Sequence, residues 1–216
     1  MSARDNILER IRTAGGKGGA GRPEDRAAIT SYIAAHKPGP RPRMDWGPLA
    51  RFRERVLMLA STFDEVEALP AVPRAVADYL RSHELPLTAV CWPGLSELSW
   101  HEAGMSVEAR AARGADLVGI TGVFCAVAET GTLMLLSGPR TPGATSLLPE
   151  THVAVVRAGQ LVRSMEEAWE RVRSECGRLP RAVSFVSGPS RTADIEQTLT
   201  LGAHGPYRVH VLWVPD

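Results

Sequence analysis

The sequence predicts an α/β fold: a mostly parallel sheet with helices on both faces, preceded by a helical arm. From about Pro48 onward, helical and strand patterns alternate along the chain, which is typical of strands that pair in parallel. Several strand candidates are apolar at successive positions, as are strands covered on both faces. We therefore expect a helical arm and linker over residues 1–47 and one α/β domain over residues 48–216.

Composition narrows the function classes. The chain has 216 residues, of which 44% are hydrophobic and 23% charged, as in an ordinary soluble globular protein. Its formal net charge of +1 provides no basic field, so we expect no nucleic-acid partner. The N-terminus lacks a basic-then-apolar signal pattern, and Glu129 interrupts the apolar run that starts at Val123. We expect a cytoplasmic protein without a membrane span.

The expected arm contains two short helices. Ser2 is a suitable N-cap for the first helix, and the glycine-rich residues 15–21 end it as a flexible linker. The second helix is predicted over residues 23–36, with Pro23 in its first turn. Residues 37–48 are rich in proline and arginine and forbid regular structure. The arm could dock on a neighbouring subunit or a partner, or pack on its own domain.

Periodicity places the remaining elements. We expect helices over residues 48–60, 72–81, 165–172 and 191–201. We expect strands over residues 63–66, 87–92, 123–128, 132–137, 151–156, 182–187 and 207–214. Residues 107–113 are helical or irregular. The two strands at residues 123–137 are expected to form a hairpin at the centre of the sheet.

The tip of this hairpin is the first candidate site. Gly131 can adopt the positive φ of a three-residue loop, which would hold Glu129 and Thr130 at the mouth of the sheet. A carboxylate between apolar strands is costly to place, so Glu129 is a candidate catalytic base or nucleophile. We expect Thr130, Gly131 and Thr132 to contact a ligand. The alternative is that Glu129 only caps the turn in water.

A second candidate site follows the strand at residues 182–187. A glycine step and a helix beginning near Arg191 would offer free backbone N–H groups to an anion. We expect Gly188, Ser190, Arg191 and Thr192 to bind it. Alternatively, Ser190 or Thr192 caps the helix and Arg191 pairs with Asp194.

A third candidate site is the loop at residues 202–206. Gly202 suits the C-terminal cap of the preceding helix, and His204 is a candidate catalytic acid or base near neutral pH. Gly205 is a candidate ligand contact beside it. Alternatively, His204 is an uninvolved surface histidine.

Four stretches of the body form a distinctive set of motifs. They are Glu129-Thr130-Gly131-Thr132; Leu147, Pro149, Thr151 and His152 leading into a strand; the run from Ser187 to Glu196; and Gly202-Ala203-His204-Gly205-Pro206. Together they resemble the LUD-domain family, and within it the lactate utilization protein C group. The run from Ser187 is long enough to be specific, whereas the first stretch alone is weak. The resemblance covers the chain from about Pro48 to the C-terminus.

This resemblance implies a fold related to the sugar-phosphate isomerase and CoA-transferase superfamily, and a role with partner subunits in oxidising L-lactate to pyruvate. Larger relatives carry ferredoxin-type cysteine runs. Here Cys91, Cys125 and Cys176 are far apart, without C-x-x-C spacing, and suit buried free thiols. We expect this chain to bind no metal and no cofactor itself, and electrons to leave through iron–sulfur partner proteins. A nicotinamide site is also not expected, because no G-x-G-x-x-G follows the first strand.

Two hypotheses follow. In the first, the chain is a subunit or accessory protein of lactate utilization whose pocket binds a small anionic ligand. In the second, it is a free-standing isomerase- or CoA-transferase-type enzyme that uses Glu129. Either could be a homo-oligomer.

Overall fold

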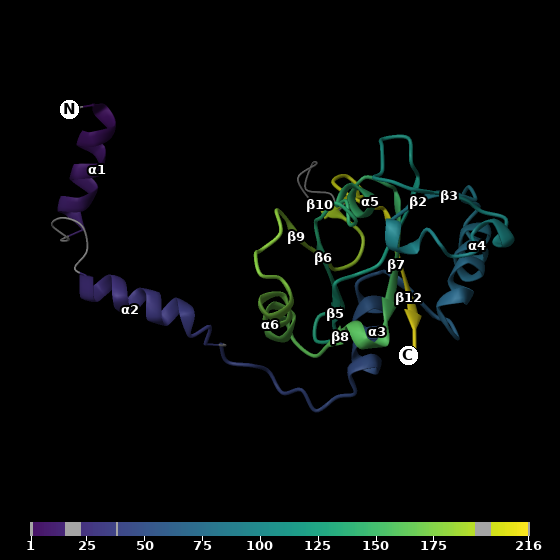
Figure 1. Ribbon diagram of the computed structural model, residues 1–216, viewed down its shortest axis with the longest axis horizontal. Helices are drawn as coiled ribbons and strands as arrows, with labels where there is room; N and C mark the ends of the chain where they lie inside the picture. The colour runs from purple at the N-terminus through teal and green to yellow at the C-terminus, as the bar shows by residue number, and fades with distance from the viewer. Residues whose placement is uncertain (1, 16–22, 38, 193–199, 216) are drawn as a thin grey trace. The chain divides into compact units, whose positions relative to one another are not determined.

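The structure is a computed structural model that describes residues 2–15, 23–37, 39–192 and 200–215 (Figure 1). It divides into two compact units, Met1–Arg43 and Met44–Asp216. We call them the arm and the body and describe each by itself.

The arm contains the two predicted helices, α1 (Ala3–Ala14) and α2 (Pro23–Ala34). Ser2 caps α1 as predicted: its Oγ accepts from the Asp5 backbone N–H, and the Asp5 carboxylate accepts from the Ser2 N–H at 2.9 Å. Pro23 opens α2, where the missing N–H has no intrahelical partner to lose. Neither helix has a buried residue.

The body is built on a six-stranded sheet in which every paired strand is parallel. Its order is β1 (Thr62–Glu65), β12 (Arg208–Val214), β7 (Thr151–Arg157), β4 (Val118–Thr121), β2 (Thr88–Cys91) and β3 (Ser106–Ala109). The predicted mostly parallel sheet is confirmed. The central β7 and β12 are buried almost throughout, as strands covered on both faces must be.

Helices cover this sheet on both faces, as predicted (Figure 1). On one face α4 (Val72–Ser82) packs against alternate residues of β7, Val153 and Val155. On the other face α3 (Pro48–Met58) and a second sheet pack against Ala154 and Val156. The alternation follows from the two-residue period of a strand. Short 3₁₀ turns complete the body: η1 (Leu69–Ala71), η2 (Pro93–Leu95), η3 (His101–Ala103) and η4 (Ala158–Gln160).

The predicted hairpin forms, but its expected place at the centre of the main sheet is wrong. It belongs to a separate four-stranded sheet of β8 (Leu161–Val162), β5 (Cys125–Val127), β6 (Thr132–Leu136) and β9 (Val183–Val186). One face of this sheet packs toward the main sheet and the other against α6 (Met165–Glu175). Both faces are therefore covered, which explains why the apolar pattern did not distinguish the two sheets.

Two strands of the main sheet were not predicted. β4 lies next to β7 and was not assigned, and β3 falls at the start of residues 107–113, which were expected to be helical or irregular. β4 is short and contains Gly119, which weakens a strand pattern. The glycine is required here because an added Cβ would lie 2.0 Å from the Thr145 carbonyl oxygen of α5 (Ala144–Leu147).

The predicted helix over residues 191–201 is wrong at both ends. β10 (Arg191–Thr192) pairs antiparallel with β11 (Thr200–Leu201), while residues 193–199, including Asp194, lie outside the described residues. The Ser190 N–H donates to Pro206 O, and the Gly202 N–H donates to Ser190 O, both at 2.9 Å. These bonds between the flanking loops continue into the β10–β11 ladder and hold the described ends extended.

Candidate functional site

Three hydroxyl groups form a chain where the β5–β6 hairpin meets the end of β9. Thr130 Oγ1 lies 2.7 Å from Thr132 Oγ1, which lies 2.8 Å from Ser187 Oγ. Thr132 is buried, whereas Thr130 and Ser187 are exposed, so the chain leads from the surface to the start of β6. Three hydroxyls bring three protons, and two bonds use two of them. We call this group the hydroxyl chain; one of its three O–H protons is not used by these two hydrogen bonds.

The hairpin tip beside the hydroxyl chain is fixed against α3. Gly131 has φ +70°, as predicted, and an added Cβ would lie 2.6 Å from Arg55 Cβ. The Gly131 N–H donates to Val127 O at 2.9 Å, and the Glu129 N–H donates to Arg163 O at 3.0 Å. Since Val127 pairs with Thr132, the loop spans residues 128–131, one residue more than predicted. Glu129 is half-buried at this rigid tip.

Gly188 and Arg191 lie at the C-terminus of a helix, α3, whereas a helix N-terminus was predicted here. Arg191 Nη2 donates to Leu59 O at 3.1 Å, and Leu59 is the C-terminal cap of α3. Gly188 has φ +86°, and an added Cβ would lie 2.3 Å from the same oxygen. A cation at a helix C-terminus is favourable because it complements the negative end of the helix dipole. The expected helix N-terminus at Arg191 is therefore wrong, although the exposed guanidinium keeps further N–H donors.

The structure brings Ser190 and Gly205 together. An added Cβ on Gly205 would lie 3.3 Å from Ser190 Cβ, so the two predicted loops are in contact. Thr192 is buried in β10. Gly202 has φ +78° but follows a strand, so its predicted role as a helix cap is wrong.

His204 lines an open surface pocket of about 600 Å³, which we call the His204 pocket. Its lining residues are Leu147, Leu148, Glu150, Leu201, Gly202, Ala203, His204, Gly205, Tyr207 and Arg208. Within the described part of the chain, no hydrogen bond or ion pair joins His204 to Glu129 or to the hydroxyl chain. The predicted site residues thus form two groups. One is the hairpin tip with the hydroxyl chain, and the other is the pair of loops that contains Ser190, Gly205 and His204. Residues 187–190 connect the two groups along the chain.

Comparison with known families identifies the body. The model of the LUD domain matches residues 56–214. The chain belongs to the LUD domain family. The arm lies outside the matched residues.

Individual relatives of this LUD domain protein carry two kinds of name. Lactate utilization protein C of Shouchella clausii is 40% identical over 101 residues, which are 46% of this chain and 44% of that protein. An uncharacterized protein of Neisseria meningitidis is 39% identical over 99 residues, 45% of this chain and 42% of that protein. The match therefore spans less than half of either curated relative.

A solved structure supports the fold. The crystal structure of a DUF162 family protein from Deinococcus radiodurans superposes with a TM-score of 0.60 and 29% sequence identity. It covers 77% of this chain and 96% of that protein. Both proteins therefore share the α/β architecture, whereas the relation to the sugar-phosphate isomerase and CoA-transferase superfamily stays a prediction.

The described residues contain no disulfide, no group of metal ligands and no membrane-spanning helix. Cys91, Cys125 and Cys176 are free thiols, and burial raises the pKa of both Cys91 and Cys125 to about 11. Within these ranges no three His, Cys, Asp or Glu residues are grouped to hold a metal ion. The helices described are also too short or too polar to cross a bilayer.

The main sheet contains a buried histidine on each face, and neither was assigned from the sequence as a site residue. His210 Nδ1 lies 2.8 Å from Thr62 Oγ1, and its ring stacks on Tyr79 with centroids 3.9 Å apart. Burial, and secondarily His83, lowers the pKa of His210 to about 3. On the other face His152 Nε2 lies 2.8 Å from Thr121 Oγ1, and burial lowers its pKa to about 4. The signal that could have identified each histidine in the sequence is its position as a polar residue in an otherwise apolar strand.

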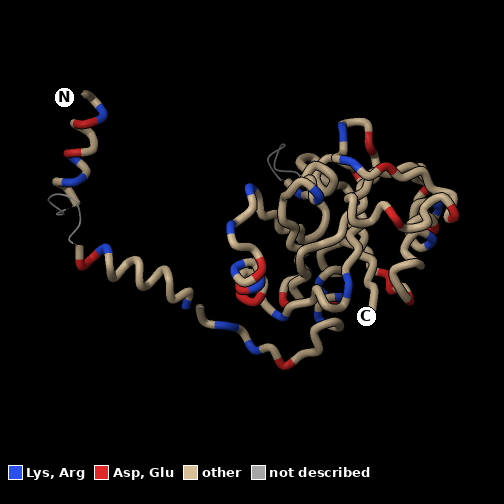
Figure 2. Tube along the Cα trace, in the orientation of Figure 1, with Lys and Arg blue, Asp and Glu red and all other residues tan. Residues whose placement is uncertain are grey.

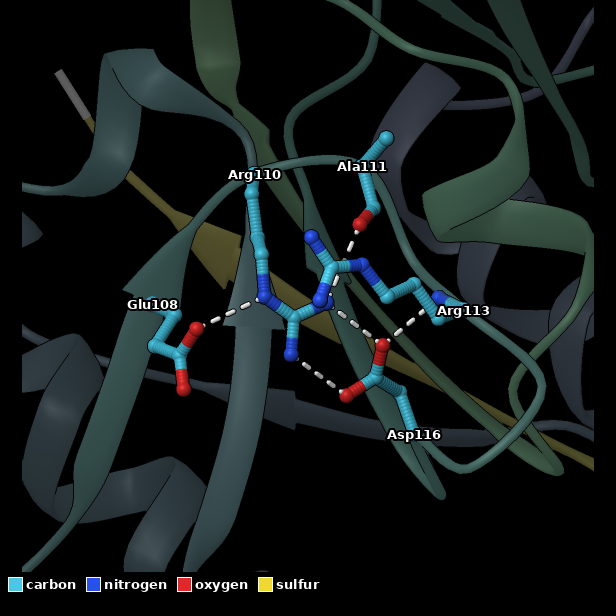
Figure 3. A network of polar contacts seen from close by, with 5 residues as sticks. All are labelled: Glu108, Arg110, Ala111, Arg113 and Asp116. Atoms are coloured by element: carbon cyan, nitrogen blue, oxygen red, sulfur yellow. Dashed lines mark hydrogen bonds and ion pairs between the residues drawn. The ribbon is translucent and has the colours of Figure 1, made fainter.

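A polar network fastens the loop between β3 and β4 (Figure 3). Arg110 holds both Asp116 carboxylate oxygens, at 2.7 and 2.8 Å, and donates to Glu108 at 2.7 Å. The Arg113 backbone N–H also donates to Asp116. The hydrogen bond from Arg110 lowers the pKa of Asp116 to about 2. Because these groups satisfy one another, the network is structural. Elsewhere along the body, acidic and basic residues are interspersed (Figure 2).

Proposed function

We propose that this protein serves lactate utilization as a subunit or accessory protein of a system that oxidises L-lactate to pyruvate. Membership of the LUD domain family and the name of the Shouchella relative support the pathway. The observation that carries the site assignment is the hydroxyl chain beside Glu129, a half-buried carboxylate at a rigid hairpin tip.

A small carboxylate fits the donors at this place. The unused O–H of the hydroxyl chain and the N–H groups of Arg191 that do not bond Leu59 would hold its oxygens, and hydrogen bonds to a charged group are the stronger kind. Glu129 would accept the proton of a substrate hydroxyl. Oxidation of L-lactate then breaks the O–H and C2–H bonds, forms the C2 carbonyl, and releases two protons and two electrons.

The electrons require an acceptor, and we infer that iron–sulfur partner proteins supply it. The three cysteines of this chain are far apart in sequence, and the two most buried are held as thiols at neutral pH by their raised pKa. They are thus poorly suited to ligate a cluster together. Free thiols are also typical of the reducing cytoplasm, where we place the protein.

A second candidate function is a free-standing isomerase- or CoA-transferase-type enzyme. The observation in its favour is that the Glu129 carboxylate makes no hydrogen bond or ion pair with the described residues, which suits a base or nucleophile. This function predicts turnover by the pure chain without partners.

Co-purification from lactate-grown cells, followed by assay, tests the proposal. We expect iron–sulfur proteins in the complex, lactate oxidation by the complex, and none by the pure chain with artificial acceptors. Lactate oxidation by the pure chain, or stoichiometric iron in it, would contradict the subunit assignment.

Growth on lactate tests the role of Glu129. Glu129→Gln is nearly isosteric, so we expect normal protein level but impaired growth when it replaces the natural protein. Glu97→Gln, at an exposed position, is the matched control. Normal growth with Glu129→Gln would show that the carboxylate serves only the turn.

A further inference from the structure

The His204 pocket gathers exposed apolar side chains. The described part of the body has these exposed large apolar residues: Leu57, Met58, Leu117, Leu147, Leu148, Leu179, Phe185, Leu201 and Tyr207. Four of these nine line the one pocket, with exposed fractions of 44% for Leu147, 57% for Leu148, 39% for Leu201 and 46% for Tyr207. Single exposed apolar residues are ordinary, whereas a group of them around a hollow marks a binding surface.

The same pocket contains a cation, Arg208. The guanidinium carbon of Arg208 lies 4.9 Å from the Tyr207 ring centroid, and Arg208 is half-buried. Within the described residues, no carboxylate lies within ion-pair distance of it, although Glu150 lines the same pocket. An arginine stacked on an aromatic face keeps its N–H donors directed away from the ring, where they suit a carboxylate.

Rigid elements hold these groups. Arg208 begins β12 and is paired with Thr151 of β7, and its backbone N–H donates to Glu150 O at 2.9 Å. On the loop side, an added Cβ on Gly202 would lie 3.1 Å from Tyr207 Cβ, so the wall is closely packed. The pocket therefore lies at the amino ends of the two central strands, with Leu147 of α5 at its border.

We propose that the His204 pocket binds a carboxylic acid whose apolar body is much larger than the methyl group of lactate. The carboxylate pairs with Arg208, the apolar body covers Leu147, Leu148 and Leu201, and His204 borders the polar end. Glu150 accepts a hydrogen bond from a neighbouring hydroxyl, which favours a 2-hydroxy acid over a plain fatty acid. The volume of about 600 Å³ is that of a pocket for a molecule of this class. The site is separate from the hydroxyl chain, so either assignment can fail alone.

Calorimetric titration of the full-length protein with four probes tests the ligand class. We expect 2-hydroxyoctanoate to bind most tightly, octanoate next, and octylamine and L-lactate much more weakly at this pocket. Each buried methylene should tighten binding about fourfold. Absence of saturable 2-hydroxyoctanoate binding, or octylamine binding as tight as octanoate, would overturn the proposal; the latter would indicate a purely apolar docking surface.

Variants locate the binding. Arg208→Met should weaken octanoate binding about tenfold and leave octylamine binding unchanged, whereas Leu148→Ser should weaken both. Arg74→Met and Leu179→Ser, at exposed positions outside the pocket, are the matched controls. Thermal unfolding verifies that each variant keeps its fold. Equal octanoate affinity in the wild type, Arg208→Met and Leu148→Ser would overturn the proposal, whatever L-lactate does at the hydroxyl chain.

Discussion

The two sheets of the body differ in how their polar groups are placed. In the six-stranded sheet, β7 and β12 are buried almost throughout, and their histidines lie deep between covering layers. In the four-stranded sheet, β9 is half-buried to exposed, and its end supplies Ser187 to a hydroxyl chain that reaches the surface. The large sheet therefore provides the stable frame, while the small sheet places hydrogen-bonding groups at the surface.

The largest expected effect is a loss of folding stability at low pH, caused by the two buried histidines of the six-stranded sheet. His152 and His210 have folded pKa values of about 4 and about 3, below the ordinary value of 6.5. Between the ordinary pKa of 6.5 and these lower folded values, the unfolded chain binds protons that the folded chain does not. The free energy of unfolding is therefore fully present above pH 6.5 and falls as the pH is lowered. Each histidine should cost about 1.4 kcal/mol per pH unit at most. Urea unfolding at pH 7 and pH 5 measures the loss.

His210→Phe is the control for this effect. It keeps an aromatic ring on Tyr79 but cannot bind a proton, so the slope of stability against pH should fall by up to half of the histidine contribution. Identical slopes in the variant and the wild type would contradict the assigned origin.

The hairpin tip of the small sheet should be the next most sensitive place. Gly131→Ala adds a Cβ to a residue with φ +70°, 2.6 Å from Arg55 Cβ and 2.8 Å from the Val56 backbone nitrogen. Strain and overpacking together should lower the free energy of unfolding by about 2–4 kcal/mol. Gly94→Ala, where nothing lies within 4 Å, should change it by less than about 0.5 kcal/mol. Comparable losses in both variants would show that the tip is not closely packed.

The hydroxyl chain should respond more through binding than through stability. Thr132→Val keeps the shape of the side chain but removes the middle hydroxyl, at about 1 kcal/mol of stability. If the chain donates to a carboxylate, L-lactate affinity should fall about tenfold by calorimetry, and Thr132→Ser should restore most of it. Unchanged L-lactate affinity in Thr132→Val would show that the hydroxyl chain does not bind L-lactate.

The smallest effect is expected at the edge of the frame. The Asp116 pKa of about 2 lies below its ordinary 3.8, so its contribution is present above pH 4 and lost as the pH falls through 2. Because the pair with Arg110 is close to solvent, we expect Asp116→Asn to cost only about 1 kcal/mol at pH 7. Glu97→Gln is the control, and thermal unfolding at pH 7 is the measurement. A loss above about 3 kcal/mol would indicate a buried role instead.

Long apolar elements could be predicted from the sequence because their periodicity is strong. The helices α3, α4 and α6 and the strands β7 and β12 lie close to their expected ranges, and Gly131 has the expected positive φ. In contrast, β4 has only four residues, and its pattern is interrupted by Gly119. That glycine is required by the close packing of α5, a tertiary contact that the local sequence does not show.

The site was predicted less completely because its groups meet through tertiary contacts. Local signals after Gly188 favoured a helix, yet loop-to-loop hydrogen bonds hold Arg191 and Thr192 in a strand. Nothing in the local sequence indicates that Leu59 accepts from Arg191, or that Ser187 meets Thr132, because each pair is more than fifty residues apart. The binding and catalytic roles assigned to these residues are predictions.

If Arg191 binds a ligand as proposed, its hydrogen bond to Leu59 links that binding to the end of α3. The carbonyl of Leu59 ends that helix, and β1 begins three residues later at Thr62. The proposed ligand takes the other N–H groups of Arg191 and keeps this bond, whereas a ligand that took the donor itself would leave a helix-terminal oxygen to be solvated by water, at a cost to its affinity. By thermodynamic reciprocity, any change that loosens the last turn of α3 shifts the occupancy of the site. On this proposal, substitutions at the end of α3 change the affinity without contacting the ligand.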